Sequence, residues 1–291
     1  MTDTPPKETD AEETDEAVTL TSQERLQVRK SRRSSSPVIF ETIRQEGIEE
    51  LERPFFSLWW SGLAAGLLMS LSLFAKGYLH HYLPDEAWRP LVSNFGYCIG
   101  FLLVIVGRLQ LFTENTITPV LPLLVTPTLW RLRTMVRLWT VVFVANIAGT
   151  FISVGLIENA GLALPHQITA FLEVSHHLAD RSALANIGLG VPAGLLLAAL
   201  VWALADTKGT RFWLIVSVTY VIALGEFSHV IAGSAEVFML AFHGEMTFGA
   251  AFGQFILPTL IGNVLGGTGL FALLAYGQVR HEITADDETR S

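Results

Sequence analysis

The residues best able to do chemistry lie in an apolar stretch, Leu224 to Ala235, with the sequence LGEFSHVIAGSA. Glu226, Ser228 and His229 interrupt this stretch. Lipid tolerates such an interruption only where protein or a water-filled cavity satisfies the freed backbone, and an ionisable group there indicates a functional site. Because histidine titrates near neutral pH and can donate a hydrogen bond or a proton, His229 suits a proton relay for a weak acid.

A second apolar run, from about residue 91 to Gly107, is interrupted in a similar way. The polar residues that follow it are Arg108, Gln110, Thr113, Glu114, Asn115, Thr116 and Thr118. A straight membrane helix needs about 20 mostly apolar residues, so this segment is also predicted to break. Thr113 and His229 lie 116 positions apart, and we interpret them as matched positions of two breaks. The half-helix N-termini at such breaks would attract an anion.

Other combinations of reactive residues predict no site. The single cysteine, Cys98, cannot form a disulfide framework or a cysteine metal site. Four histidines without a carboxylate or cysteine at metal-ligand spacing are expected to be solvated in loops, namely His80, His81, His176 and His177. The chain also lacks a Gly-x-Ser-x-Gly elbow. We predict no metal, no cofactor and no nucleic-acid partner. An intramembrane enzyme using His229 with Glu226 or Glu114 is a remote alternative.

Composition places these residues in a membrane protein. Of 291 residues, 51% are hydrophobic and 16% are charged, and the mean hydropathy is +0.44. Soluble domains average about 25% charged residues. Six membrane segments are expected, at residues 55–79, 91 onward through the first break, 138–157, 187–204, 212–242 with a break at 226–235, and 250–276. The predicted fold class is an all-α integral membrane protein whose second and fifth helices are broken.

The regions outside the spans have distinct compositions. Residues 1–36 are acidic and then basic, and we predict a disordered cytoplasmic tail. Its basic part is either a solvated linker or a segment attracted to anionic lipid. Residues 37–53 read as an amphipathic helix, either at the membrane surface or packed against a neighbouring helix. Residues 54–281 form the predicted channel domain, and residues 282–291 a short cytoplasmic tail. No apolar region follows Met1, so no cleaved signal peptide is expected.

The loops and an internal repeat predict the topology. Lysine and arginine gather in two short loops, at residues 131–137 and 208–211, which places both termini in the cytoplasm. Asn146 and Asn263 lie 117 positions apart among small residues, a composition that lets helices approach closely. Either asparagine could serve only to hold helices together. Three spans per repeat is an odd number, so the two halves are expected to be inverted.

The motifs at the breaks resemble those of the formate/nitrite transporter family. Residues 110–113 read Gln-Leu-Phe-Thr where the family has an acidic residue, Leu, Phe and Thr. Residues 227–232 read Phe-Ser-His-Val-Ile-Ala where the family has Phe-Glu-His-Ser-Ile-Ala, and Gly-Asn-x-x-Gly-Gly at 262–267 is a third match. The resemblance covers about residues 37–281.

This resemblance implies an aquaporin-like protomer with six helices, each protomer carrying its own pore. It also implies a homopentamer in the plasma (inner) membrane of a prokaryote. Thr113 and His229 would form the polar centre of the pore. By position, the constriction residues would be Tyr97, Phe101, Leu111 and Phe112. Glu114 and Asn115 would either line a vestibule or satisfy the broken backbone.

Several residues depart from the family pattern and bear on the solute. Arg108 stands where the family has glycine, Ser228 where it has glutamate, and Glu226 lies two residues earlier. We hypothesise that Arg108 and Glu226 pair, because either charge alone in lipid costs at least about 2.5–3.5 kcal/mol. The predicted function is a channel for small monovalent anions or their conjugate weak acids, since a neutral acid crosses a dry constriction at lower cost than its anion. The alternative is a different small solute, selected by Arg108 and Glu226.

Overall fold

The structure is a computed structural model that describes residues 21, 23, 34–207 and 209–288, with side chains up to residue 282. The chain divides into two units, Met1–Ser34 and Ser35–Ser291, and the second contains nearly all described residues. Nearly all of the predicted tail at residues 1–36 lies outside the described residues. At the other end, the last helix continues to Glu288 through most of the predicted second tail.

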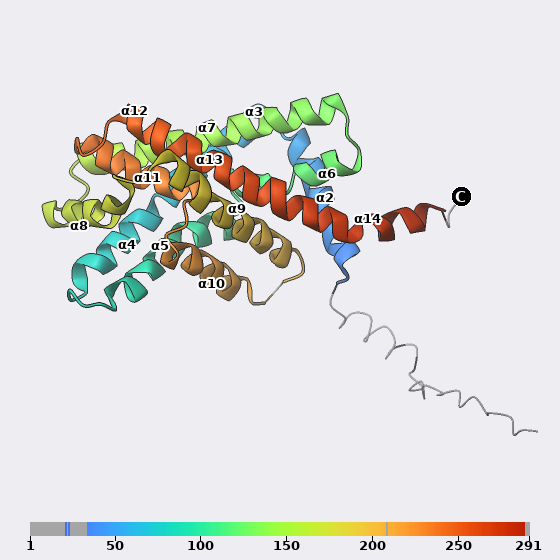
Figure 1. The fold of residues 1–291 in the computed structure, drawn as a ribbon, viewed down its shortest axis with the longest axis horizontal. Coiled ribbons are helices and arrows are strands. Elements are labelled where there is room, and N and C mark those ends of the chain that lie inside the picture. Colours follow the sequence, from blue (N-terminus) through green and yellow to red (C-terminus); the bar gives the residue numbers. More distant parts are fainter. Residues whose placement is uncertain (1–20, 22, 24–33, 208, 289–291) are drawn as a thin grey trace, which may run out of the picture. The chain divides into compact units, whose positions relative to one another are not determined.

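The described part of the second unit is built from helices and contains no strand (Figure 1). Its longer helices are α2 (Ser36–Glu52), α3 (Phe55–Met69), α4 (Leu71–Tyr82), α5 (Arg89–Val106), α7 (Leu129–Asn159), α8 (Pro165–Ser175), α9 (Ala183–Ala205), α10 (Arg211–Leu224), α11 (Val230–Phe242), α13 (Leu257–Val264) and α14 (Leu273–Glu288). The short elements are η1 (Glu114–Thr116), α6 (Val120–Val125), η2 (His176–Leu178), α12 (Phe248–Ala250) and two π-helical turns, η3 (Ala251–Ile256) and η4 (Leu265–Ala272).

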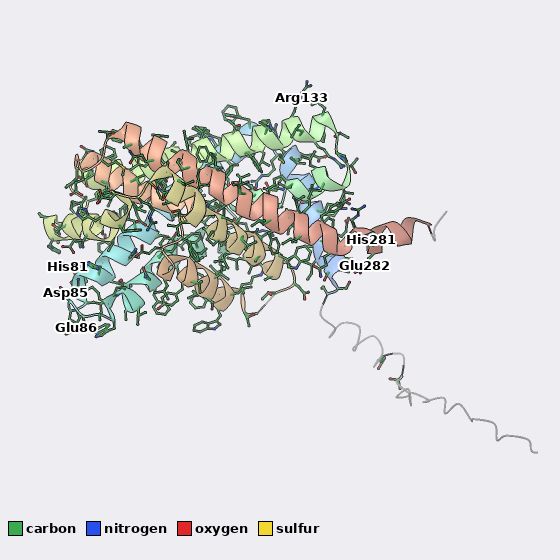
Figure 2. The ribbon with its side chains drawn as sticks, in the orientation of Figure 1. His81, Asp85, Glu86, Arg133, His281 and Glu282 are labelled. Carbon is green, nitrogen blue, oxygen red and sulfur yellow. The ribbon has the colours of Figure 1, made fainter. Side chains whose placement is uncertain are left out.

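Five helical stretches among the described residues are long and apolar enough to cross a membrane. They are Phe55–Tyr82, Arg89–Val106, Leu129–Asn159, Ala183–Ala205 and Phe248–Glu282. The prediction of an all-α membrane protein is confirmed at this level. The residues labelled in Figure 2 lie at the ends of the helical unit, with His81, Asp85 and Glu86 at one end and Arg133, His281 and Glu282 at the other.

The second break is shorter than the predicted 226–235. Helix α10 ends at Leu224 and α11 begins at Val230, so residues 230–235 are helical. His229 is the N-cap of α11, and its Nδ1 accepts a hydrogen bond from the Ala232 N–H at 3.1 Å. The small residues that suggested a longer break serve packing instead, since a Cβ at Gly233 would overlap the Phe255 ring.

Helix α2 packs on the membrane helices rather than standing apart. Its buried residues are Phe40, Ile43, Gly47 and Leu51. Gly47 allows close contact with the backbone of Thr118 before α6, and the Phe40 ring lies 6.1 Å from that of Tyr276 in α14. Of the two placements considered for this helix, the structure therefore has the apolar face against neighbouring helices.

The two breaks share one backbone geometry. Arg108 has φ 53° and Glu226 has φ 49°, and these are the only non-glycine residues with positive φ in the part of the chain that the structure describes. In each break the next amide donates five residues back: Leu109 to the Val104 carbonyl at 3.0 Å, and Phe227 to that of Ile222 at 3.0 Å. This arrangement is the Schellman ending of a helix, usually completed by glycine. The equivalent residues of the two breaks are therefore 118 positions apart.

A buried asparagine holds each break. Asn146 Oδ1 accepts from the Phe112 N–H at 2.9 Å, and its Nδ2 donates to the carbonyls of Gly62 and Gln110 at 2.8 Å each. Asn263 does the same with the Val230 N–H at 2.9 Å and the carbonyls of Gly190 and Ser228 at 2.8 Å. Asparagine offers an acceptor and two donor hydrogens, which match the three backbone groups that a broken helix leaves free. Both side chains are fully buried.

Candidate functional site

Thr113 and His229 meet at the centre of the unit, where both are buried. Thr113 Oγ1 lies 2.8 Å from His229 Nε2. Because Nδ1 accepts the Ala232 N–H, the proton of the neutral imidazole is on Nε2 and is donated to the threonine hydroxyl. The two residues are therefore hydrogen-bond partners. In contrast to the prediction from the sequence, they are not equivalent positions of the two breaks, because Leu111 is the residue 118 positions before His229.

Aromatic and apolar side chains surround this centre. The Phe101 ring lies 4.9 Å from the His229 ring and 5.3 Å from that of Tyr97. Leu111 is 1% exposed and lines a second cavity at the first break. Phe112, which the resemblance grouped with these residues, turns away. Its ring packs on those of Trp139 and Phe143, 5.8 and 5.4 Å away, in an apolar groove apart from the centre.

One cavity reaches His229 from the side of η2. We call it the Arg181 vestibule; about 30 Å³ of it is accessible to water-sized molecules, enough for one or two waters. Its polar lining consists of Lys76, Tyr97, His177, Arg181, Glu226, Ser228, His229 and Glu236. Arg181 Nη2 lies 2.9 Å from Glu226 Oε2, and Nη1 donates to the Glu226 carbonyl at 3.1 Å. The Ser228 hydroxyl donates to Asn186 Oδ1 at 3.0 Å.

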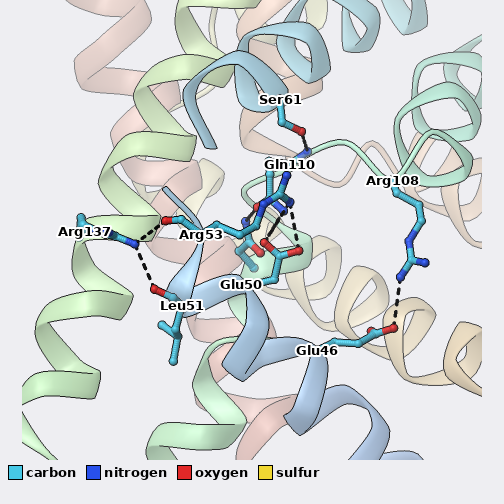
Figure 3. Close-up of polar contacts among 9 residues, drawn as sticks. Glu46, Glu50, Leu51, Arg53, Ser61, Arg108, Gln110 and Arg137 are labelled. Carbon is cyan, nitrogen blue, oxygen red and sulfur yellow. Dashed lines mark hydrogen bonds and ion pairs between the residues drawn. The ribbon is translucent and has the colours of Figure 1, made fainter. Parts of the chain in front are cut away.

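A larger cavity of about 370 Å³ opens on the other side, and we call it the Arg108 vestibule. Its polar lining consists of Glu46, Glu49, Glu50, Arg53, Arg108, Gln110, Glu114, Asn115 and Thr118. Gln110 Nε2 donates to Glu50 Oε2 at 2.6 Å, and Arg108 Nη2 lies 3.4 Å from Glu46 Oε1 (Figure 3). Glu114 and Asn115 both line this vestibule, and Asn115 Nδ2 donates to Gln110 Oε1 at 2.9 Å.

The hypothesis that Arg108 pairs with Glu226 is wrong. Arg108 pairs with Glu46 and Glu226 with Arg181, in different vestibules. The two residues cannot meet because they occupy equivalent positions in different breaks. Each is the positive-φ residue at the end of its own half-helix, and each break faces its own cavity. Neither charge needs the other, because the Arg108 side chain is 80% exposed and that of Glu226 61%.

The loop histidines are not simply solvated. His80 Nε2 lies 3.0 Å from Glu173 Oε2 and His176 Nδ1 lies 3.4 Å from Glu245 Oε2, while His177 lines the Arg181 vestibule. Among the described residues no group of three or more His, Cys, Asp or Glu is placed to hold a metal ion. Burial, followed by the charges of Lys76 and Arg181, lowers the pKa of His177 to about 3.

Sequence reasoning missed several lining residues. The glutamates of α2 were assigned to a helix outside the channel, although three of them line the Arg108 vestibule. For Glu236 the sequence allows either a place in the lining of the second half-helix or a contact with a neighbouring subunit, and in the structure it lines the Arg181 vestibule, seven residues after His229. Seven residues are two helical turns, so both face the same side of α11. That spacing could have identified Glu236, whereas no spacing identifies His177, which a loop brings to the cavity.

Comparison with known proteins agrees with this arrangement. The family profile described as formate/nitrite transporter matches residues 37–277. The inner membrane protein YfdC of Escherichia coli (strain K12) is 37% identical over 251 residues, which cover 86% of this chain and 81% of the relative. The uncharacterized transporter YrhG of Bacillus subtilis (strain 168) is 26% identical over 82% of this chain and 92% of its own.

Two solved structures have a similar fold. A pentameric formate channel with formate bound superposes with a TM-score of 0.66 at 18% identity, over 78% of this chain and 97% of its own. An ion channel of the FNT family superposes with a TM-score of 0.66 at 21% identity, over 84% and 96%.

Proposed function

Because the chain belongs to the formate/nitrite transporter family, we propose that it is a membrane channel or transporter for small monovalent anions or their conjugate weak acids. The observation that carries the proposal is the Thr113–His229 contact, buried between two polar vestibules. The solute would pass this contact by displacing the threonine hydroxyl and accepting the Nε2 hydrogen of His229. An anion gains most from that donor, since hydrogen bonds to charged groups are the stronger ones.

We propose His229 as a proton relay with one structural condition. Transfer of a proton to the solute requires a second proton on the ring, since a neutral imidazole that gave up its only proton would become an anion. Nδ1 can take that proton only when its hydrogen bond from the Ala232 N–H opens. The relay is therefore coupled to the first turn of α11.

Uptake into proteoliposomes of formate, nitrite and hydrosulfide, each at two pH values, tests this function. His229→Asn is the matched variant, because asparagine is a good N-cap that can accept the Ala232 N–H but does not titrate. We expect wild-type uptake to depend on pH and this variant to lose that dependence. His229→Ala, which loses the N-cap as well, shows how much uptake depends on the structure of the break. Uptake by His229→Asn with unchanged pH dependence would refute the relay.

A different small solute remains the second candidate, and one observation favours it. The Arg108 vestibule holds four glutamates, Glu46, Glu49, Glu50 and Glu114, against two arginines. Such an excess of carboxylates opposes the entry of anions and favours cationic or neutral solutes. If wild-type liposomes take up none of the three anions at either pH, this candidate replaces the first. We do not propose an enzyme, since the family consists of transporters.

We further propose a homopentamer in the plasma (inner) membrane of a prokaryote, with inverted three-helix repeats and both termini cytoplasmic. The fold of a pentameric formate channel supports the assembly. The breaks with equal geometry 118 positions apart support the repeat. In this orientation the Arg108 vestibule faces the cytoplasm. Native mass spectrometry tests the pentamer, and labelling of single cysteines at Arg133 and Asp85 from either side tests the orientation.

A further inference from the structure

Glu236 is a buried carboxyl that the central contact does not use. The residue is 4% exposed, and its Oε2 has no hydrogen-bond partner among the described residues. The group with which it pairs is His177, whose Nε2 lies 3.8 Å from Oε2. That distance is too long for a direct hydrogen bond. Burying an unpaired carboxylate costs several kcal/mol, so this position calls for a proton or a donor.

The position of the hydrogen on the His177 ring is a second reason to expect a proton on Glu236. Its Nδ1 lies 3.0 Å from the carbonyl oxygen of Val174, and a carbonyl can only accept. Nδ1 therefore carries the hydrogen, and Nε2 of the neutral ring is an acceptor. That acceptor faces the oxygen of Glu236, which is a second acceptor whenever the carboxyl is ionised. Without a donor between them, two buried acceptors at this distance repel each other, and a proton on the carboxyl removes that repulsion.

No hydrogen bond or ion pair joins Lys76 or Arg181, the two cations that line the vestibule, to Glu236 among the described residues. The charged and titratable groups that face the pair in the vestibule are Lys76 from α4, Tyr97 from α5, Arg181 after η2, and Glu226 and His229 from the break. Arg181 is held by Glu226 at 2.9 Å, and η3 contributes only the apolar Phe255. The His177 side chain is 29% exposed, whereas that of Glu236 is 5% exposed. His177 therefore connects the buried carboxyl with water outside.

We propose that Glu236 and His177 together bind one proton and exchange it with the solute before or after the solute meets His229. The inference rests on the proposed transport of weak acids. Glu236 lies two turns of α11 from His229, about 10 Å along the axis, and both line the same cavity. A solute in the Arg181 vestibule therefore passes the pair on its way to the centre.

The exchange is balanced in both directions. When an anion enters, the O–H bond of Glu236 breaks and an H–X bond forms on the solute, leaving a carboxylate. The pair then regains a proton from water through His177. A neutral acid leaving the centre returns its proton by the same steps in reverse. The low pKa of His177, about 3 because of burial and the nearby Lys76 and Arg181, keeps the shared proton on the carboxyl side.

Difference infrared spectroscopy on the purified full-length protein tests the proton site without transport. The carbonyl stretch of protonated, buried carboxyls should be present near neutral pH, and the part of it that Glu236 contributes should be lost in Glu236→Gln. Glu173→Gln is the matched control, because Glu173 is an exposed carboxyl outside the vestibule that pairs with His80. His177→Gln should shift the pH at which the band disappears. A wild-type band that is unchanged in Glu236→Gln across the neutral range would overturn the proposal.

Uptake measurements separate this inference from the proposed function. With the pH varied on the Arg181 side, Glu236→Gln should lose the wild-type dependence of the uptake rate, and Glu173→Gln should keep it. A band that depends on Glu236 in a protein that transports no weak acid would refute the proposed function and support the proton site. Transport that depends on His229 and is unchanged in Glu236→Gln would overturn the exchange.

Discussion

Removal of the Asn263 side chain should be among the most damaging single changes in the chain. In Asn263→Ala three buried backbone groups lose their partner: the Val230 N–H and the carbonyls of Gly190 and Ser228. None of them can recover a helical hydrogen bond without rebuilding the break. Asn146→Ala removes the equivalent three contacts at the first break. We expect both variants to lose stability by similar amounts.

The size of the loss follows from the number of contacts. Polar pairs between membrane helices are worth about 0.6 kcal/mol on average, which sets a lower bound of about 2 kcal/mol for three. A buried group left unsatisfied costs about 1–3 kcal/mol, which would give up to about 9 kcal/mol if water never entered. Because the vestibules admit water near each break, we expect about 3–5 kcal/mol in the free energy of unfolding.

Unfolding of the purified protein in detergent, followed by helical circular dichroism against denaturant, measures this loss. Asn94→Ala is the matched control: Asn94 is also buried, but its side-chain oxygen has no hydrogen-bond partner among the described residues. We expect the control to cost less than about 1 kcal/mol. An Asn263→Ala protein as stable as the wild type would refute this expectation. So would an Asn94→Ala protein that loses as much stability as Asn263→Ala or Asn146→Ala.

Three further predictions use the same unfolding measurement. Gly194→Ala should cost about 1–3 kcal/mol, because its Cβ would overlap the backbone of Asn263, whereas Gly188→Ala, with open space around it, should be neutral or stabilising. Arg108→Gly should be more stable than Arg108→Ala by about 1 kcal/mol, and Glu226→Gly more stable than Glu226→Ala by a similar amount, since both positions have positive φ. Equal stability of the glycine and alanine variants would contradict the assigned backbone geometry. Between pH 6.5 and about 3, His177 binds a proton in the unfolded state but not in the native state, so wild-type stability should fall as the pH decreases through this window. His177→Gln should flatten that fall, and an unchanged slope would contradict the low pKa of native His177.

The centre of the site could be predicted from the sequence because its residue types are unusual for their surroundings. His229 and Thr113 stand out in apolar segments, and the asparagines stand out among small residues. The register of the two breaks could not be predicted in the same way. Matching the two most polar residues gave an offset of 116, but the backbone contacts give 118. Side-chain type is a poor guide to register where the two halves have diverged.

The lining of the vestibules depended on packing that the sequence does not encode locally. An amphipathic helix with glutamates opposite its apolar residues predicts only that the two faces differ in environment. Whether the polar face meets bulk water or a cavity depends on where the helix docks. In the structure the buried face of α2 contacts the region before α6, which brings Glu46 and Glu50 to Arg108 and Gln110. The same limit applies to His177, whose position depends on the course of a loop.

The equal geometry of the breaks explains why their chemistry can differ so much. The positive-φ residue, the five-back hydrogen bond and the asparagine contacts all use backbone atoms of the break, so they constrain conformation without fixing most side chains. The equivalent pairs are therefore free to be Arg108 and Glu226, Gln110 and Ser228, or Leu111 and His229. Only one of these positions places a titratable ring against Thr113. The proton chemistry of the centre thus arises from a side-chain difference carried on a shared backbone.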